Sequence, residues 1–248
     1  MKPAVQAFVL SLALAAAGAA AASLSIDSIR ATLTVGEMTL RSTPNTMGFS
    51  LSSPSGSYSG SVSNGTMPLA SLDAHVDADS GTVLTLNSKP LRRKDCDYLF
   101  RTTLTARPDR PGVLVEMALR NVGAYPAETY FYFLLTPVQC GYYEDEDGEQ
   151  RASTGVIRLK RWLYLPTSNN AGGYGLVFPE PGDISFETLY PRPDWRKPGW
   201  YFIPRGRRDL VQPGGEKKFS FLVFPAGSAA EVAAVALAST SQGRCSTH

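Results

Sequence analysis

The sequence is poor in the residues that usually build metal centres, and it has little excess charge of either sign. Its 248 residues contain two histidines and three cysteines, and no two cysteines form a CxxC pair. A zinc site of ordinary spacing is therefore not expected. The 24 lysines and arginines are balanced by 22 aspartates and glutamates. A nearly neutral chain is a poor general binder of nucleic acid, because that binding depends on neutralising many phosphates.

Cofactor and nucleophile motifs are also missing. We find no phosphate-binding P-loop, no dinucleotide-binding glycine fingerprint and no nucleophile elbow. The acidic run EDEDGE at 144–149 alternates oxygen ligands, but it lacks the twelve-residue spacing and the closing glutamate of a calcium loop. We interpret it as an exposed acidic hairpin tip. The sequence thus predicts neither a metal nor a cofactor.

Long hydrophobic runs are confined to the N-terminus. The chain opens MKPAVQAFVLSLALAAAGAAAAS, in which Lys2 precedes an apolar run and then a series of small residues. This pattern predicts a secretory signal peptide over residues 1–22, cleaved after Ala22. The alternative is an N-terminal membrane anchor, for which the Ala-rich run is short. Residues 23–248 are then expected to form one exported domain, secreted or periplasmic, without a membrane span.

Three cysteines, an odd number, remain after the predicted cleavage. Export permits a disulfide, but at least one thiol must be left over or must pair between chains. We favour a Cys96–Cys140 bridge, because Cys245 lies in a polar tail near the end of the chain. The open alternative is that all three cysteines are reduced.

Alternating apolar and polar residues dominate the chain after the N-terminus, and Gly, Pro, Asn and Asp separate the alternating segments. Strand centres about 10 to 15 residues apart are typical of sandwiches and barrels. We therefore predict an all-β fold, a large antiparallel β-sandwich with little helix. The predicted strands cover residues 23–35, 37–42, 81–88, 98–107, 112–122, 127–138, 155–166, 174–180, 184–190 and 217–227.

Two segments interrupt this pattern. Residues 228–240 have a helical composition, with Ser228 as a candidate N-cap and Glu231 three residues later, so a short helix is predicted within the tail 228–248. Residues 50–65 are rich in serine and glycine, and they indicate an exposed loop or weak edge strands.

The order of features in the second half resembles galactose mutarotase-like domains, the supersandwich of the aldose 1-epimerases. The segment GDISFETLYPRPDW is followed by a connection and then by LVQPGGEKKFSFLVF. By this resemblance Glu187 occupies the family's glutamate position, and the turn is formed by Leu210, Pro213, Gly214 and Glu216. The segment MALRNVGAYPAETYFYFLL resembles the family's strand that ends in Asn and returns, but the returning strand carries no histidine here. The resemblance implies a supersandwich that binds a sugar on a concave sheet.

Around Glu187 the sequence offers a candidate sugar site. Glu187 is the best catalytic or ligand-contacting carboxylate, the alternative being a surface carboxylate paired with a nearby arginine. The loop that follows it, PRPDWRKPGWYFIPRGR, interleaves aromatic and basic residues. Aromatic faces stack on sugar C–H faces, and arginines can hold a carboxylate or sulfate with two hydrogen bonds. The alternative is that the loop packs its aromatics on the sandwich. The predicted ligand-binding residues here are Trp195, Arg196, Trp200, Tyr201 and Arg205.

Two further groups are weaker candidates. In RRKDCDYLFR, Tyr98 and Arg101 would reach the same sugar site if the strand faced it, and a solvated face is the alternative. His75 lies in a polar region before a strand, and a histidine side chain is a common general acid or base. It is otherwise an incidental loop histidine.

Three functions follow from these observations. The first is an exported carbohydrate-binding protein, non-catalytic or accessory, with some preference for anionic sugars. The second is a carbohydrate-active enzyme, epimerase-like or polysaccharide-lyase-like, that uses Glu187. The third is a structural envelope or interaction protein without a small ligand. An oligo- or polysaccharide is the expected partner, and no protein partner is indicated.

Overall fold

A computed structural model of the chain describes residues 22–26, 30–54, 56–60, 68–77, 81–93, 96–128, 133–135, 142–151, 156–158, 160–166, 172–179, 184–189, 199–204 and 210–242. The predicted signal peptide, apart from Ala22, lies outside these residues. So do Cys140 and Cys245, and with them the predicted disulfide.

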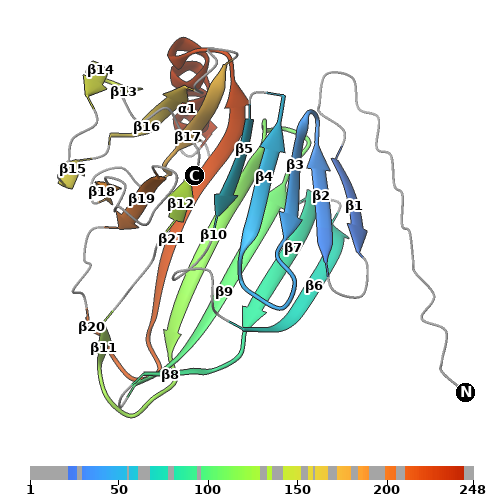
Figure 1. The fold of residues 1–248 in the computed structure, drawn as a ribbon, viewed down its shortest axis with the longest axis vertical. Helices are drawn as coiled ribbons and strands as arrows, with labels where there is room; N and C mark the ends of the chain where they lie inside the picture. The colour runs from blue at the N-terminus through green and yellow to red at the C-terminus, as the bar shows by residue number, and fades with distance from the viewer. Residues whose placement is uncertain are drawn as a thin grey trace, which may run out of the picture.

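The first layer is a ten-stranded antiparallel sheet, which runs through the length of the molecule (Figure 1). Its strands follow the order β14-β13-β16-β17-β21-β10-β9-β7-β6, and β8 pairs with β9 beside this path. The strands are β6 (Leu69–Asp77), β7 (Gly81–Ser88), β8 (Leu91–Arg93), β9 (Cys96–Ala106), β10 (Val113–Asn121), β13 (Tyr142–Asp145), β14 (Gly148–Arg151), β16 (Trp162–Pro166), β17 (Gly173–Val177) and β21 (Glu216–Ala226).

The second layer consists of two antiparallel sheets. Five strands in chain order lie across the first layer: β1 (Ala22–Ile26), β2 (Ala31–Val35), β3 (Met38–Ser42), β4 (Phe49–Ser53) and β5 (Gly56–Gly60). Beside β5 lies β12 (Phe133–Leu135), which begins a four-stranded sheet. That sheet continues with β19 (Gly199–Pro204), β18 (Ile184–Leu189) and β15 (Val156–Arg158). A separate two-stranded sheet pairs β11 (Ala127–Glu128) with β20 (Leu210–Val211).

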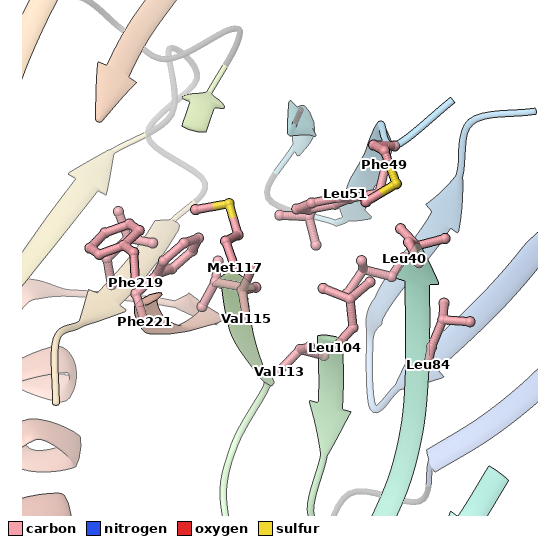
Figure 2. Packing of buried hydrophobic residues seen from close by; sticks show 14 of the residues in the cluster. Leu40, Phe49, Leu51, Leu84, Leu104, Val113, Val115, Met117, Phe219 and Phe221 are labelled. Carbon is pink, nitrogen blue, oxygen red and sulfur yellow. The ribbon is translucent and has the colours of Figure 1, made fainter. Parts of the chain in front are cut away.

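Alternation along the strands creates the core between the layers. In an extended strand successive side chains point to opposite faces, so every second residue faces the partner layer. Val113, Val115 and Met117 of β10 are at most 1% exposed. They share one buried cluster with side chains of the second layer such as Leu40 and Leu51 (Figure 2). The all-β sandwich predicted from this alternation is confirmed.

The single helix of the described chain, α1 (Ala229–Gln242), lies where the sequence predicts it. The Glu231 N–H donates to the Ser228 hydroxyl at 3.4 Å, and the Gly227 N–H donates to Glu231 Oε2 at 2.8 Å, so both capping residues act as expected. The helix packs on the outer face of β16, β17 and β21, where Val232 is fully buried. In the part of the chain that the structure describes, no helix combines the length and the apolar character needed to cross a membrane.

Several local predictions need correction. The predicted strand 23–35 is two strands, β1 and β2, which pair with each other. In the Ser- and Gly-rich segment 50–65, the alternative of edge strands is right in part, because β5 is an edge strand of the five-stranded sheet. The loop alternative is wrong for β4, which lies inside that sheet with Leu51 fully buried. His75 is in strand β6 and not in a loop before a strand.

The interpretation of EDEDGE as a hairpin tip is confirmed, since β13 and β14 pair around it.

Candidate functional site

Glu187 and Tyr201 occupy directly opposite register positions in two neighbouring strands. The connection 190–198 leaves β18 at Leu189 and enters β19 at Gly199, and these two residues pair with each other. Two positions further into this hairpin, Glu187 is directly opposite Tyr201. On its other side Glu187 is opposite Val156 of β15. Residues directly opposite in an antiparallel pair belong to the same face of the sheet. The register therefore assigns the positions of Glu187 and Tyr201 to the same face of the sheet.

Trp200 occupies the other face of the same sheet. It is opposite Thr188 of β18 and Leu135 of β12. Thr188 is the residue next to Glu187 in β18, so the register position of Trp200 is adjacent to that of Glu187. Because the faces of a strand alternate with each residue, Trp200 and Glu187 belong to opposite faces. The structure also shows that Trp200 and Tyr201 are in a strand, where the sequence predicts a loop. The remaining predicted residues of this stretch, Trp195, Arg196 and Arg205, lie outside the described residues.

Arg101 lies on the outer face of the ten-stranded sheet. Its Nη2 is 3.6 Å from Glu216 Oε2, and the Nζ of Lys218 is 3.2 Å from Glu216 Oε1. In the register, Arg101 and Lys218 are both opposite Ala118, one on each side. The carboxylate of Glu216, a residue of the predicted PGGE turn, thus lies between the cationic groups of Arg101 and Lys218. Ala118 lies between these two cations in the sheet. This face is turned away from the second layer, so the structure does not bring Arg101 to Glu187.

Tyr98 belongs to the core. It is on the inner face of β9, opposite Asn121 of β10, and is 6% exposed. Its ring centroid is 6.2 Å from that of Phe100, which is also buried. Little of the Tyr98 ring is therefore available to a ligand, although the sequence places it near a basic patch.

His75 is exposed on β6, the last strand of the ten-stranded sheet, and lies opposite Val83 of β7. On the same face Asp73 accepts hydrogen bonds from Ser71 Oγ at 3.0 Å and from Asn87 Nδ2 at 3.1 Å. Asn87 is in turn opposite Arg101. His75 and Arg101 therefore share the outer face of one sheet, while Glu187 belongs to the other layer.

Asn121 is a buried polar residue whose role the sequence does not reveal. It ends β10 and is fully buried. Its Nδ2 donates to the carbonyls of Tyr125 at 2.7 Å and Val211 at 2.8 Å, and its Oδ1 accepts the Gly123 N–H at 2.9 Å. Its backbone pairs with Gly214 and Gly215 of the predicted turn. The only signal in the sequence is the strand-ending Asn in MALRNVGAYPAE, because Val211 is 90 positions away from it.

The acidic hairpin between β13 and β14 is held by its own hydrogen bonds. Asp145 is 6% exposed and accepts the Asp147 N–H at 2.8 Å, while Lys160 Nζ is 2.6 Å from Asp147 Oδ2. Burial, reinforced by the nearby Asp147, raises the pKa of the Asp145 carboxyl. Burial and the same carboxylates raise the pKa of Tyr143 to about 12. Among the described residues, no group of acidic, histidine or cysteine side chains is arranged to hold a metal ion.

Comparison with known proteins identifies similar structures but no related sequence. No protein-family model matches the sequence, and no curated protein matches it. A proposed aldose 1-epimerase from Klebsiella pneumoniae has a similar structure, with a TM-score of 0.56 and 12% identity over 90% of this chain and 88% of that chain. The galactose mutarotase-like resemblance is thus confirmed for the fold.

Two larger proteins contain the same fold. A xanthan lyase from Paenibacillus matches with a TM-score of 0.54 and 10% identity, over 87% of this chain. An α-N-acetylgalactosaminidase from Bifidobacterium bifidum, solved as a GalNAc complex, matches with a TM-score of 0.53 and 11% identity, over 86% of this chain. This chain spans 26% of that lyase and 39% of that glycosidase. At these identities the likeness concerns the fold alone.

Proposed function

We propose that this protein is an exported carbohydrate-binding β-sandwich protein that acts as a non-catalytic or accessory module. The observation that carries the proposal is the fold, which three carbohydrate-active proteins of different activities share with nearly the whole chain. The export part depends on the N-terminal pattern, which predicts that the exported form begins at Ser23. The intact mass of protein recovered from the medium or periplasm tests that part.

The four-stranded sheet of the second layer is the proposed binding surface. It carries Glu187 and Tyr201 at directly opposite positions and Trp200 in the neighbouring register position. The basic residues on either side of β19 in the sequence would supply the cations for an anionic sugar, with Arg196 and Arg205 as the predicted contacts. A tyrosine beside a carboxylate suits a sugar, because the ring covers C–H groups while the carboxylate accepts hydroxyl protons.

Binding to an array of neutral and anionic glycans tests the proposal directly. We expect binding of wild-type protein, with a loss of about tenfold or more for Tyr201→Ala, since stacking and hydrogen bonding on one aromatic contribute about 1–3 kcal/mol. Arg101→Ala is the matched control, because Arg101 lies on the outer face of the other layer. Silence of the wild type on every glycan contradicts the proposal. Loss of binding by the Arg101 variant alone moves the site to the ten-stranded sheet.

A second candidate function, a carbohydrate-active enzyme, is favoured by the Glu187–Tyr201 pairing. Acid–base chemistry at a sugar needs two proton-transferring groups near one another, and Glu187 and Tyr201 occupy directly opposite register positions. Turnover of a bound glycan would be followed by NMR, which detects ring-opening, epimerisation and cleavage. Loss of turnover with retained binding in both Glu187→Gln and Tyr201→Phe supports the enzyme. Equal turnover in wild type and both variants excludes it at this site.

A further inference from the structure

Strand β6 forms one edge of the sandwich in the described part of the chain. It is the last strand of the ten-stranded sheet, and its only strand partner within the described chain is β7, although the N–H of its first residue, Leu69, also donates to the Asn45 carbonyl at 2.9 Å. It is nine residues long, and a long edge strand presents a row of backbone groups that another strand can pair with. Both β6 and the edge strand of the second layer, β1, lie at the same side of the molecule in Figure 1, where β1 is beside β7.

The core is incompletely sealed along this side. Leu72 and Ala74 of β6 are half-buried and pack against the main core, and Leu24 of β1 does the same. The next residues on these inward-facing positions are much more exposed: Val76 is 46% exposed and Ile26 is 37% exposed. Two large aliphatic side chains at core-facing positions are therefore open to solvent at one edge.

The sequence of β6 is complementary to itself in antiparallel pairing. Side chains on a strand alternate between its two faces, and the inward-facing Leu72, Ala74 and Val76 of β6 all have even residue numbers. Two copies of β6 therefore match apolar face to apolar face only if even-numbered residues lie opposite even-numbered residues. With Ala74 opposite Ala74 of a second copy, Leu72 lies opposite Val76 on the inward face. On the outward face, Asp73 then lies opposite His75, and this pair occurs twice because of the two-fold symmetry.

Charge distinguishes this register from its neighbours. Moving the two-fold axis from Ala74 to Asp73 places Asp73 opposite Asp73, and moving it to His75 places Asp73 opposite Asp77. Like charges directly opposite destabilise a strand pair, whereas an imidazole N–H can donate to a carboxylate. Asp73 Oδ2 already accepts from Ser71 and Asn87, which fixes this exposed carboxylate in position.

We propose that β6 is a homodimer interface, at which two copies pair edge to edge around a two-fold axis at Ala74. The pairing joins the two ten-stranded sheets into one continuous sheet and covers Val76. It is independent of the proposed sugar site, which lies in the second layer. The partner is a second copy of this chain because the apolar and charged patterns of β6 match their own reversal.

The register gives a covalent test. Directly opposite residues in an antiparallel pair have Cα atoms about 4.5–5.5 Å apart, within the range that a disulfide spans. Ala74→Cys should therefore form a cross-linked dimer under mild oxidation, beyond any cross-link of the wild-type cysteines. Val76→Cys is the matched control on the same face and should stay uncross-linked, since it faces Leu72. Cross-linking of the control but not of the Ala74 variant overturns the register.

Sedimentation of the purified protein over a range of concentrations tests the dimer itself. His75→Asp and Asp73→His should each weaken the dimer about tenfold, since two cross-strand pairs are changed, and the double variant should restore it. Val76→Lys should abolish dimerisation, while Val122→Lys, another exposed aliphatic position, should leave it intact. The proposal is overturned if the wild type is a monomer at all concentrations or if the Val76→Lys variant still forms the dimer. It is also overturned if the double variant dimerises as weakly as the two single variants while all three are folded.

Discussion

Asn121 holds the backbone of Val211 through a 2.8 Å hydrogen bond from its Nδ2, although the two residues are 90 positions apart in the chain. The same amide group donates to the Tyr125 carbonyl at 2.7 Å. One buried side chain thus fixes the turn after β10 to the segment that precedes β21. Asn121 therefore supplies the hydrogen-bond donor for the Tyr125 and Val211 carbonyls at the end of the sandwich that carries the PGGE turn.

Removal of the Asn121 amide should destabilise the protein strongly. Asn121→Ala leaves the buried Val211 carbonyl and the part-buried Tyr125 carbonyl without this donor, at a cost of about 3 kcal/mol in the free energy of unfolding. Urea denaturation measures this cost. Asn87→Ala is the control, because Asn87 also makes side-chain hydrogen bonds, but at the surface, and should change the free energy by about 0.5 kcal/mol or less. Equal losses in the two variants would contradict the assigned role.

The strands that the sequence predicts best are those whose alternation is complete. In β21, Phe219, Phe221 and Val223 all face the core, and their spacing of two is visible in KKFSFLVF. The helix was equally predictable, because Ser228 and Glu231 mark its start locally. These elements depend on short-range patterns that a single sequence contains.

The missed strands lack that pattern for physical reasons. β4 reads FSLSS, and only Phe49 and Leu51 mark its buried face, so its burial comes from neighbouring strands on both sides. β6 is an edge strand with Asp73 and His75 on its solvent face, which weakens its hydrophobic signal. Likewise, the Glu187–Tyr201 pairing depends on the length of the connection between β18 and β19, which residue types alone do not determine.

Helix α1 should depend on a glycine in the sheet below it. A Cβ at Gly175 would lie 2.7 Å from Phe224 Cζ and 2.7 Å from Val232 Cγ2, in a place where both side chains are buried. Gly175→Ala should therefore cost about 2 kcal/mol by overpacking, measured by thermal or urea denaturation. Gly227→Ala, whose Cβ would be 3.6 Å from its nearest neighbour Glu231 Oε2, should cost much less. The reverse order would show that α1 does not pack as described.

The face assignment within the four-stranded sheet predicts a pattern of coupling in sugar binding. Glu187 and Tyr201 are directly opposite, so Glu187→Gln and Tyr201→Phe should have non-additive effects on the dissociation constant of a bound glycan. Glu187→Gln and Trp200→Ala should be additive, because these positions belong to opposite faces. Two double-mutant cycles, measured by calorimetry, provide the test. Coupling in the Trp200 cycle and none in the Tyr201 cycle would contradict the register.

The buried carboxyl of Asp145 should make its own contribution to the pH dependence of stability. Burial and the nearby Asp147 raise its pKa in the folded state, so between the unfolded and folded pKa values the folded chain binds more protons than the unfolded chain. Stability from this group is therefore present at low pH and is lost as the pH rises through the raised pKa. Asp145→Asn removes the charge but keeps an oxygen that can accept the Asp147 N–H.

At pH 7 we expect Asp145→Asn to have a urea midpoint equal to or above that of the wild type. As the pH falls through the raised pKa of Asp145, the wild type should gain stability relative to this variant, because its own carboxyl becomes neutral in the fold. Urea midpoints of both proteins between about pH 3 and pH 7, the range in which carboxyl groups titrate, give the difference curve. Glu149→Gln, an exposed change on the same hairpin, controls for the loss of one acidic residue. A wild type that becomes less stable than Asp145→Asn on acidification would reverse the sign and show that the carboxylate is favoured in the folded hairpin.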